Sequence, residues 1–354
     1  MDMKLYDRSG KLKKNIKYDV NIDLANETKK AMAKALDTND TRVLNKIGAF
    51  SSLYDIKFKE YKNPVLVLKT EEPGSKQLIA AQYNKLENVS YDMINHLIND
   101  CIVMGAKPLT VQDAIICGKM DKEAINKIVK SVADACKKQE CVLTGGETSE
   151  QPGVLKPGTY ILTSSIVGIV DKDKIIDGSK IKEGDIVIAL ESSGIHTNGY
   201  TLVRQIMKKY PQILKEKVDG KNFIDAILEP HRCYYNALKD LFNKNWITGL
   251  AHITGGGICE NLNRILPSNL RAKIDASKYQ ILDIFKLLKN TANIDEKEML
   301  RTFNLGVGLT VVAKKEYAKD IIKHMKSKKI NSYIIGEIVK GNKDVIVEGS
   351  FNWN

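Results

Sequence analysis

The stretch "DIVIALESSGIHTNGYTLVR" (185–204) contains the three parts of an α/β unit. It begins with a largely apolar run, which predicts a buried strand. Its last part begins a predicted helix that continues past the stretch and has Leu202, Val203, Ile206 and Met207 on one face. The turn between these parts contains two glycines. Glycine lets the backbone approach a ligand, and a helix N-terminus presents free N–H groups, so this order predicts an anion-binding loop.

The same order of strand, glycine turn and helix returns at "HITGGGICENL" (252–262). In the first half of the chain, "PVLVLKT" (64–70) and "TYILTSSIVGIV" (159–170) have the composition of strands. The segment "MDKEAINKIVKSVADACKK" (120–138) has the apolar spacing of an amphipathic helix that begins at the N-cap Asp121. We therefore predict an α/β (α+β) fold in which each domain is a mixed β-sheet packed with helices.

The length of the chain predicts two domains. It has 354 residues, whereas a single core stops growing at about 250–300 residues. The polar, turn-rich stretch "DKDKIIDGSKIKEG" (171–184) separates the two glycine-turn units of the second half from the strands before it. We place the domains at residues 1–170 and 171–354.

Composition narrows the class of protein. The net charge is +12, but only seven of the 55 basic residues are arginine, and the lysines are spread along the chain. This pattern favours a solvated surface and no nucleic acid, although a nucleic-acid binder stays open as an alternative. The sequence has no apolar run of membrane-spanning length and no secretory signal, so we expect a cytoplasmic protein without membrane contact. Six cysteines without a C-x-x-C pair predict reduced thiols.

Carboxylates and histidines are the candidates for chemistry. Asp100 interrupts an apolar helical pattern, and Glu147 follows two glycines after a predicted strand. Mg²⁺ prefers such oxygen ligands and shares them with substrate phosphates. A solvated helix face and an acidic loop explain these positions equally well. His196 and His252, each beside a glycine turn, are candidate general acids or bases.

Five motifs, in this order, resemble the phosphoribosylformylglycinamidine cyclo-ligase (aminoimidazole ribonucleotide synthetase) family. They are "LTGGETSEQPG" (143–153), "SSGIHTNGYTLVR" (192–204), "LEPHRCYY" (228–235), "AHITGGGICENLNRILP" (251–267) and "RTFNLGVG" (301–308). The resemblance implies two α/β domains, with the N-terminal ATP- and metal-binding domains pairing in a homodimer. It also implies a reaction in which ATP drives ring closure of formylglycinamidine ribonucleotide, giving aminoimidazole ribonucleotide, ADP and phosphate in purine biosynthesis.

The resemblance also implies roles for residues of this chain. Those expected to bind ATP and its phosphates are Thr70, Gly74, Lys76, Asn99, Gly145 and Gly146. Those expected to bind Mg²⁺ are Glu71, Asp100 and Glu147, and the resemblance implies that Glu147 forms a Gly-Gly-Glu turn with Gly145 and Gly146. Those expected in the substrate loops of the C-terminal domain are Thr197, Asn198, Gly199, Thr254, Gly255, Gly256 and Gly257. The expected catalytic residues are Lys76, His196 and His252.

One stretch departs from the family pattern. The family usually reads Thr-Asp-Gly-Val-Gly-Thr-Lys where this chain reads "TEEPGSK" (70–76), which marks a divergent branch. We expect Glu71 to replace the family's Asp as the metal ligand and Glu72 to point away from the phosphates. Lys76 keeps the place of the family's Lys and is expected to reach a phosphate.

Two other functions stay open. One is a related ATP-dependent phosphoryl-transfer enzyme of the same superfamily, such as selenophosphate synthetase or thiamine phosphate kinase. The other is a non-catalytic nucleotide-binding protein whose loop is disabled by Glu72 and Pro73. ADP release that depends on formylglycinamidine ribonucleotide separates the cyclo-ligase from both.

Overall fold

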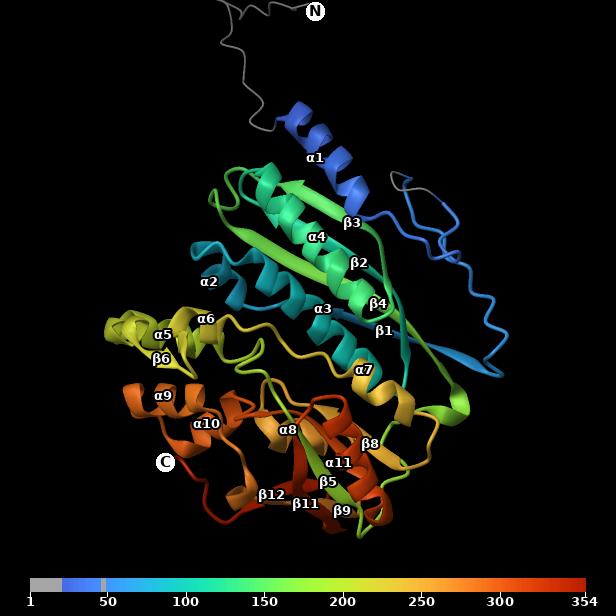
Figure 1. Ribbon diagram of the computed structural model, residues 1–354, viewed down its shortest axis with the longest axis vertical. Helices are drawn as coiled ribbons and strands as arrows, with labels where there is room; N and C mark the ends of the chain where they lie inside the picture. The colour runs from blue at the N-terminus through green and yellow to red at the C-terminus, as the bar shows by residue number, and fades with distance from the viewer. Residues whose placement is uncertain (1–20, 46–48) are drawn as a thin grey trace, which may run out of the picture.

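Two β-sheets, each covered by helices, organise the chain (Figure 1). The computed structural model describes residues 21–45 and 49–354, so the N-terminal segment on which the absence of a secretory signal was judged lies outside the described residues. Both sheets are mixed, as expected from the sequence, because each contains one parallel pair of strands among antiparallel ones. No helix among the described residues is long and apolar enough to cross a membrane.

The first sheet has four strands in the order β1-β4-β2-β3. Its strands are β1 (Pro64–Glu71), β2 (Lys107–Cys117), β3 (Val142–Glu150) and β4 (Tyr160–Asp171). The helices of this half are α1 (Ile22–Ala35), α2 (Lys76–Gln82), α3 (Leu86–Ile102) and α4 (Lys122–Lys138). The helices α3 and α4 pack on one face of the sheet. Along β1 the side chains alternate between half-buried and exposed, so Lys69 and Glu71 share the face that meets α3.

Local sequence explains the helix boundaries of this half. Asp121 caps α4 as predicted, because its carboxylate accepts hydrogen bonds from the N–H groups of Glu123 and Ala124. The predicted strand at 159–170 is confirmed as β4. The sequence also predicted that Gly145, Gly146 and Glu147 form a turn, and this is wrong. Here β3 continues through all three residues, with a bulge opposite Val111 and Gln112.

The second sheet has six strands in the order β12-β9-β11-β5-β10-β8. Its strands are β5 (Ile186–Glu191), β8 (Ile247–His252), β9 (Leu270–Asp275), β10 (Val307–Ala313), β11 (Ser332–Lys340) and β12 (Asp344–Glu348). The helices of this half are α5 (Tyr200–Lys209), α6 (Phe223–Ile227), α7 (Tyr235–Leu238), α8 (Gly257–Asn263), α9 (Asp283–Ala292), α10 (Glu296–Thr302) and α11 (Ala318–Ser327). A small hairpin joins β6 (Lys217–Val218) to β7 (Lys221–Asn222).

The helix α3 connects the two halves. Its apolar side chains, such as Ile94 and Ile98, are fully buried, and it packs on β1 and β4. Its polar side chains contact the segment 228–235 between α6 and α7. For example, Asn99 donates to the carbonyl of Arg232 at 2.8 Å and accepts from the N–H of Tyr234 at 3.0 Å. The side chains of α3 thereby satisfy the backbone of an irregular segment that no strand pairs with.

This contact generates a prediction for stability. We expect Asn99→Ala to cost about 1–3 kcal/mol, because it leaves the buried N–H of Tyr234 and the partly buried carbonyl of Arg232 without partners. Asn290→Ala is the matched control: Asn290 is exposed on α9, and its replacement should change stability by less than about 0.5 kcal/mol. Urea unfolding of both variants measures the difference. Equal midpoints for the two variants would mean that Asn99 does not hold segment 228–235.

Candidate active site

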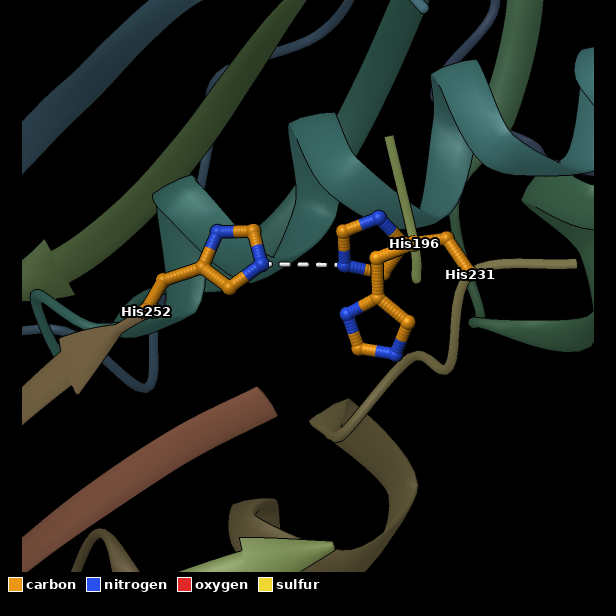
Figure 2. Close-up of side chains that lie close together, drawn as sticks. All are labelled: His196, His231 and His252. Carbon is orange, nitrogen blue, oxygen red and sulfur yellow. Dashed lines mark hydrogen bonds between the residues drawn. The ribbon is translucent and has the colours of Figure 1, made fainter. Parts of the chain in front are cut away.

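Four of the five histidines of the chain meet where the two halves touch. His96 comes from α3, His196 from the loop before α5, His231 from segment 228–235, and His252 from the end of β8. Figure 2 shows His196, His231 and His252 grouped around a hydrogen bond between two of the rings. The rings of His196 and His231 stack with their centroids 3.8 Å apart.

A continuous chain of hydrogen bonds runs through this cluster. Asp100 Oδ1 lies 2.7 Å from His252 Nδ1, and His252 Nε2 lies 2.9 Å from His231 Nε2. His231 Nδ1 lies 3.4 Å from Thr197 Oγ1, which lies 2.8 Å from His96 Nδ1. The chain starts and ends on α3, since Asp100 follows His96 by one helical turn.

Burial sets the protonation of the cluster. Burial, reinforced by the neighbouring positive groups, holds the pKa of His196 and of His231 well below the usual range. Burial and His252 lower the pKa of His96 to about 4. Burial alone would raise the pKa of Asp100, but the hydrogen bond and charge of His252, with His96 and Lys69, hold it well below the usual range. At neutral pH His96, His196 and His231 are therefore neutral imidazoles near the ionised carboxylate of Asp100.

An acidic edge adjoins the histidines. Lys69 Nζ lies 2.9 Å from Glu71 Oε2 and 3.1 Å from Asp100 Oδ2. His96 Nε2 faces the same two oxygens at 3.8 and 3.7 Å. Two of the three expected metal ligands, Glu71 and Asp100, are therefore together. The ammonium group of Lys69 lies between them, in the place that a metal cation would take. These residues fit a divalent metal ion.

The third expected metal ligand lies elsewhere in the chain. Glu147 is on β3, at the opposite edge of the sheet from Glu71 on β1. Three strand spacings separate these edges, about 14 Å. Gly145 and Gly146 lie beside Glu147 on β3. The expected set of three metal ligands is therefore not formed within one chain, and the expected phosphate contacts of the two glycines are not beside Asp100.

The role expected for Lys76 does not fit this structure. Its side chain is fully buried, and Nζ contacts Asp92 Oδ2 at 2.8 Å and the carbonyls of His196 and Glu229 at 2.9 and 2.8 Å. Burial lowers the pKa of Lys76 and raises that of Asp92 to about 6, and the charge of each partner opposes the shift of the other. All three ammonium protons are used, which leaves none for a phosphate or for catalysis.

Asn99 needs the same correction. Both ends of its amide bind the backbone of segment 228–235, and the side chain is fully buried. It fastens the two halves together and does not face an ATP phosphate. In contrast, Thr70 stays exposed on β1, where its hydroxyl contacts Ser165.

The structure brings three of the expected loops together. A Cβ on Gly74 would lie 3.5 Å from the carbonyl of Thr197, and one on Gly255 would lie 3.4 Å from Asn198 Oδ1. Gly199 caps α5 with φ at 84°, and Gly256 caps α8 with φ at 92°. Both caps need a left-handed backbone, which explains the glycines. His196 also has a positive φ, 66°, which is uncommon for a residue with a side chain and typical of functional loops.

His196 carries a proton without a partner. Its Nε2 accepts a hydrogen bond from the N–H of Ser193 at 3.1 Å, so the neutral ring holds its proton on Nδ1. Within the described residues, 21–45 and 49–354, this buried Nδ1 has no hydrogen-bond partner. A buried donor left free is costly in the ligand-free protein, and an acceptor oxygen of a bound ligand would satisfy it.

Sequence reasoning missed two residues at this interface and one on the first sheet. His96 was visible on the polar face of α3 but was not assigned a role, and nothing in the spacing of "LEPHRCYY" indicates that His231 would meet His252. Asp113 on β2 was also missed. Burial raises its pKa to about 7, and it lies so close to Gly146 that a Cβ there would be 1.9 Å from its Oδ1.

Residues 56–170 match the family "AIR synthase related protein, N-terminal domain", and residues 182–348 match the corresponding C-terminal domain. A phosphoribosylformylglycinamidine cyclo-ligase of Carboxydothermus hydrogenoformans is 39% identical over 332 residues, covering 93% of this chain and 96% of that protein. Another, from Acetivibrio thermocellus, is 42% identical over 299 residues, covering 84% and 88%. The chain belongs to this cyclo-ligase family.

Solved structures of other proteins share the fold of this cyclo-ligase family member. HypE of E. coli has a TM-score of 0.67 at 16% identity, covering 92% of this chain and 94% of that one. Thiamine-monophosphate kinase of Stenotrophomonas maltophilia has a TM-score of 0.64 at 15% identity, covering 93% and 96%. At such low identity these similarities establish the fold alone.

The neutral histidines generate a prediction about pH. In the unfolded chain a histidine has a pKa of about 6.5, whereas the folded pKa values of His196 and His231 are depressed. Below pH 6.5 the unfolded state therefore binds more protons, and stability falls as the pH falls. We expect a loss of up to about 1.4 kcal/mol per pH unit for each of these histidines between pH 6.5 and its folded pKa.

Urea unfolding at pH 7 and pH 5 measures this effect. His231→Asn should reduce the pH dependence by about one histidine's share. His324→Asn is the control, because His324 lies on α11 outside the cluster. A pH dependence that is unchanged in His231→Asn would contradict the prediction.

Proposed function

We propose that this chain catalyses ATP-dependent ring closure of formylglycinamidine ribonucleotide to aminoimidazole ribonucleotide, releasing ADP and phosphate. The relatives named above support this activity, since they cover nearly the whole chain. We place this step of de novo purine synthesis in the cytoplasm. The proposal needs one site that binds two phosphorylated ligands and excludes water between them.

The proposal rests on one observation: two kinds of group, an acidic edge and glycine-rich loops, meet at the interface between the halves. The acidic edge of Glu71 and Asp100 suits Mg²⁺, which would bind ATP phosphates and neutralise their charge there. The loops 194–199 and 254–257 present left-handed glycines and two helix N-termini to an anion. The expected substrate loops and this acidic edge are thus parts of one site, with the histidine cluster between them.

Ring closure requires activation of an amide oxygen. Transfer of the γ-phosphoryl group of ATP to that oxygen gives an iminophosphate, and attack by the neighbouring nitrogen closes the ring and expels phosphate. The free Nδ1–H of His196 is suited to donate to the amide oxygen or to the phosphoryl group on it. His252 has both ring nitrogens in hydrogen bonds, Nδ1 with Asp100 and Nε2 with His231, so it can accept the proton that the attacking nitrogen loses only when the bond to His231 opens.

Lys69 is the cation available for the phosphates in place of Lys76. It is about one-third exposed and lies at the acidic edge, whereas Lys76 is fully buried. A divalent ion bound to Glu71 and Asp100 would release the ammonium of Lys69 toward the adjacent phosphate groups. Lys69 thus supplies the positive charge that the sequence pattern assigned to Lys76.

A second candidate is phosphoryl transfer to another small molecule, because thiamine-monophosphate kinase shares the fold. The third is a nucleotide-binding protein without activity, which the burial of Lys76 would favour. All three bind ATP. They differ in whether ADP forms, and in which second substrate triggers its formation.

We predict that formylglycinamidine ribonucleotide raises ADP release by at least about 100-fold over ATP alone, since the proton-transfer groups alone typically contribute that much. A coupled assay for ADP, with aminoimidazole ribonucleotide quantified by chromatography, measures it. Thiamine phosphate serves as the control substrate. ADP release that does not respond to formylglycinamidine ribonucleotide would contradict the cyclo-ligase proposal.

The acidic edge gives a second expected result. Glu71→Gln should lower turnover at least about tenfold by weakening the metal and phosphate site, with little change in stability, because Glu71 is partly exposed. Glu72→Gln is the matched control: Glu72 is the exposed neighbour, and its loss should leave turnover nearly unchanged. Turnover and the urea midpoint are measured together. A silent Glu71→Gln combined with an inactive Glu72→Gln would reverse the two roles.

We also propose that the chain forms a homodimer through the face of the first sheet that turns away from α3. On this face Leu66 is 52% exposed and Leu68 71% exposed, and apolar side chains at this level favour a covered interface. Leu68→Lys should shift the sedimentation coefficient to that of a monomer. Leu78→Lys, at an exposed leucine on α2, should not. A monomeric unmodified protein would contradict the pairing.

A further inference from the structure

Two buried asparagines hold the backbone of the two glycine loops in the second half of the chain. Asn304 follows α10, and Asn261 lies on α8. An asparagine amide can donate two hydrogen bonds and accept two, so it can bind several backbone groups at once. Both asparagines use this capacity on a loop that the proposed function assigns to an anion.

Asn304 binds the loop between β5 and α5. Its Nδ2 donates to the carbonyls of Gly194 and Ile195 at 3.0 and 3.1 Å. Its Oδ1 accepts from the hydroxyl of Ser192 at 3.0 Å and from the N–H of Gly306 at 2.8 Å. Both donors and both lone pairs of the amide are therefore used, and the loop that carries His196 is fixed from behind.

Asn261 binds the loop between β8 and α8 in the same way. Its Nδ2 donates to the carbonyls of Gly257 and Gly255 at 2.8 and 3.1 Å, with a longer contact of 3.3 Å to that of Thr254. Its Oδ1 accepts from the hydroxyl of Thr254 at 3.2 Å. Two loops far apart in the sequence thus share one arrangement, in which an asparagine amide collects the carbonyls of the loop.

The held carbonyls leave N–H groups of the first loop free. In a trans peptide the C=O and the N–H point in opposite directions. The carbonyls of Gly194 and Ile195 face Asn304, so the N–H groups of Ile195 and His196 point away from it. Within residues 21–45 and 49–354, neither of these N–H groups has a hydrogen-bond partner.

The second loop supplies a third group of this kind. The carbonyl of Thr254 faces Asn261, so the N–H of Gly255 points away from it, and in the described part of the chain this N–H has no partner either. Gly255 is exposed, which leaves its N–H open to a ligand. The two loops are adjacent, because a Cβ on Gly255 would lie 3.4 Å from Asn198 Oδ1.

We propose that Asn304 and Asn261 are positioning residues that turn the carbonyls of both loops away from the ligand, so that free N–H groups bind the phosphate of the ribonucleotide substrate. The inference rests on the proposed function, because it assigns the loops to one group of that substrate. Successive free N–H groups attract an anion. The acidic edge takes the metal and the triphosphate of ATP, so the phosphate of the ribonucleotide is the anion left for the loops.

A second observation supports a ligand at this place. The side chain of His196 is buried on the first loop, and among the described residues its Nδ1 has no hydrogen-bond partner. Polar groups without a partner therefore come from both the backbone and a side chain of the same loop. A ligand with several acceptor oxygens would satisfy them together.

The exchange of asparagine for aspartate isolates the role of the amide. Aspartate has the same shape, but an ionised carboxylate only accepts hydrogen bonds. In Asn304→Asp it would face the carbonyl oxygens of Gly194 and Ile195, and repulsion would turn these carbonyls toward the ligand. A carbonyl oxygen in the place of an N–H repels a phosphate but has little effect on the uncharged part of the substrate.

The test compares formylglycinamidine ribonucleotide with its riboside, which lacks the phosphate. Titration calorimetry of the full-length protein, with Mg²⁺ and a non-hydrolysable ATP analogue present, gives a Kd for each. We expect the unmodified protein to bind the ribonucleotide at least about 100-fold more tightly, because each hydrogen bond to a charged group contributes about tenfold or more.

Asn304→Asp and Asn261→Asp should each reduce this preference at least about tenfold, by weakening the ribonucleotide and leaving the Kd of the riboside nearly unchanged. Asn236→Asp is the matched control, because that amide donates to the carbonyl of Lys138, outside both loops, and its preference should stay the same. Ser192→Ala removes one hydrogen bond to Asn304 and should reduce the preference at least about twofold. This milder change decides the question if Asn304→Asp does not fold.

Three results would overturn the inference. They are an unmodified protein that does not prefer the ribonucleotide, a preference that Asn304→Asp or Asn261→Asp keeps, and a loss of affinity that is equal for the two ligands, which is the mark of a purely structural role. Failure of the proposed function is recognised separately by the ADP assay. A phosphate preference that depends on both asparagines, without substrate-dependent ADP release, would keep their positioning role and discard the reaction.

Discussion

The structure depends on how the polar side chains of α3 satisfy the backbone of segment 228–235. This segment crosses between the halves without a strand partner, and side chains of α3 bind it at successive positions. Asn95 binds the carbonyl of His231, Asp92 accepts from its N–H, and Asn99 binds on both sides of Cys233. An unsatisfied buried group costs about 1–3 kcal/mol, so these contacts together are comparable to the whole stability of a domain.

The same constraint builds the site. Because segment 228–235 is held against α3, His231 is placed between His252 and Thr197, and the chain of hydrogen bonds from Asp100 to His96 closes. The ion pair of Lys76 and Asp92 belongs to this arrangement. The ammonium of Lys76 donates to the carbonyls of His196 and Glu229, which lie on two different segments of the C-terminal half. Removing either member of a fully buried ion pair leaves an uncompensated charge. The positions of the histidines therefore depend on the same contact between the halves.

Patterns of apolar residues were enough to predict most of the fold. The strand-like composition of residues 64–70 and the apolar stripe of α4 identified a strand and a helix, and Asp121 was recognised as a cap. The glycine pair before Glu147 was misread, because glycines in a sequence favour a turn, whereas here Gly146 allows β3 to pass close to Asp113. Close approach of another strand cannot be read from local sequence.

The sequence predicted the site less completely than the fold. It does not show which side chains are buried, or which residues far apart in the chain meet. Lys76 matches a family motif, but a motif does not reveal that 0% of the side chain is exposed or that its ammonium is fully bonded. His231 and His252 are 21 residues apart and meet only through the fold. Glu71 and Asp100 were assigned together through the resemblance, and the structure adds Lys69 and His96 to that edge because β1 alternates toward α3.

The charge of the acidic edge determines which ligands can bind there. Glu71 and Asp100 carry two negative charges, Lys69 carries one positive charge, and the adjacent His96 is neutral, so these four side chains have a net charge of about −1 at pH 7. Two like charges 4 Å apart repel by about 4 kcal/mol at an effective dielectric constant of 20. A triphosphate placed there would be rejected without a further cation. A divalent ion turns the same edge positive and frees Lys69, so the carboxylates that would exclude a bare nucleotide make its binding depend on the metal.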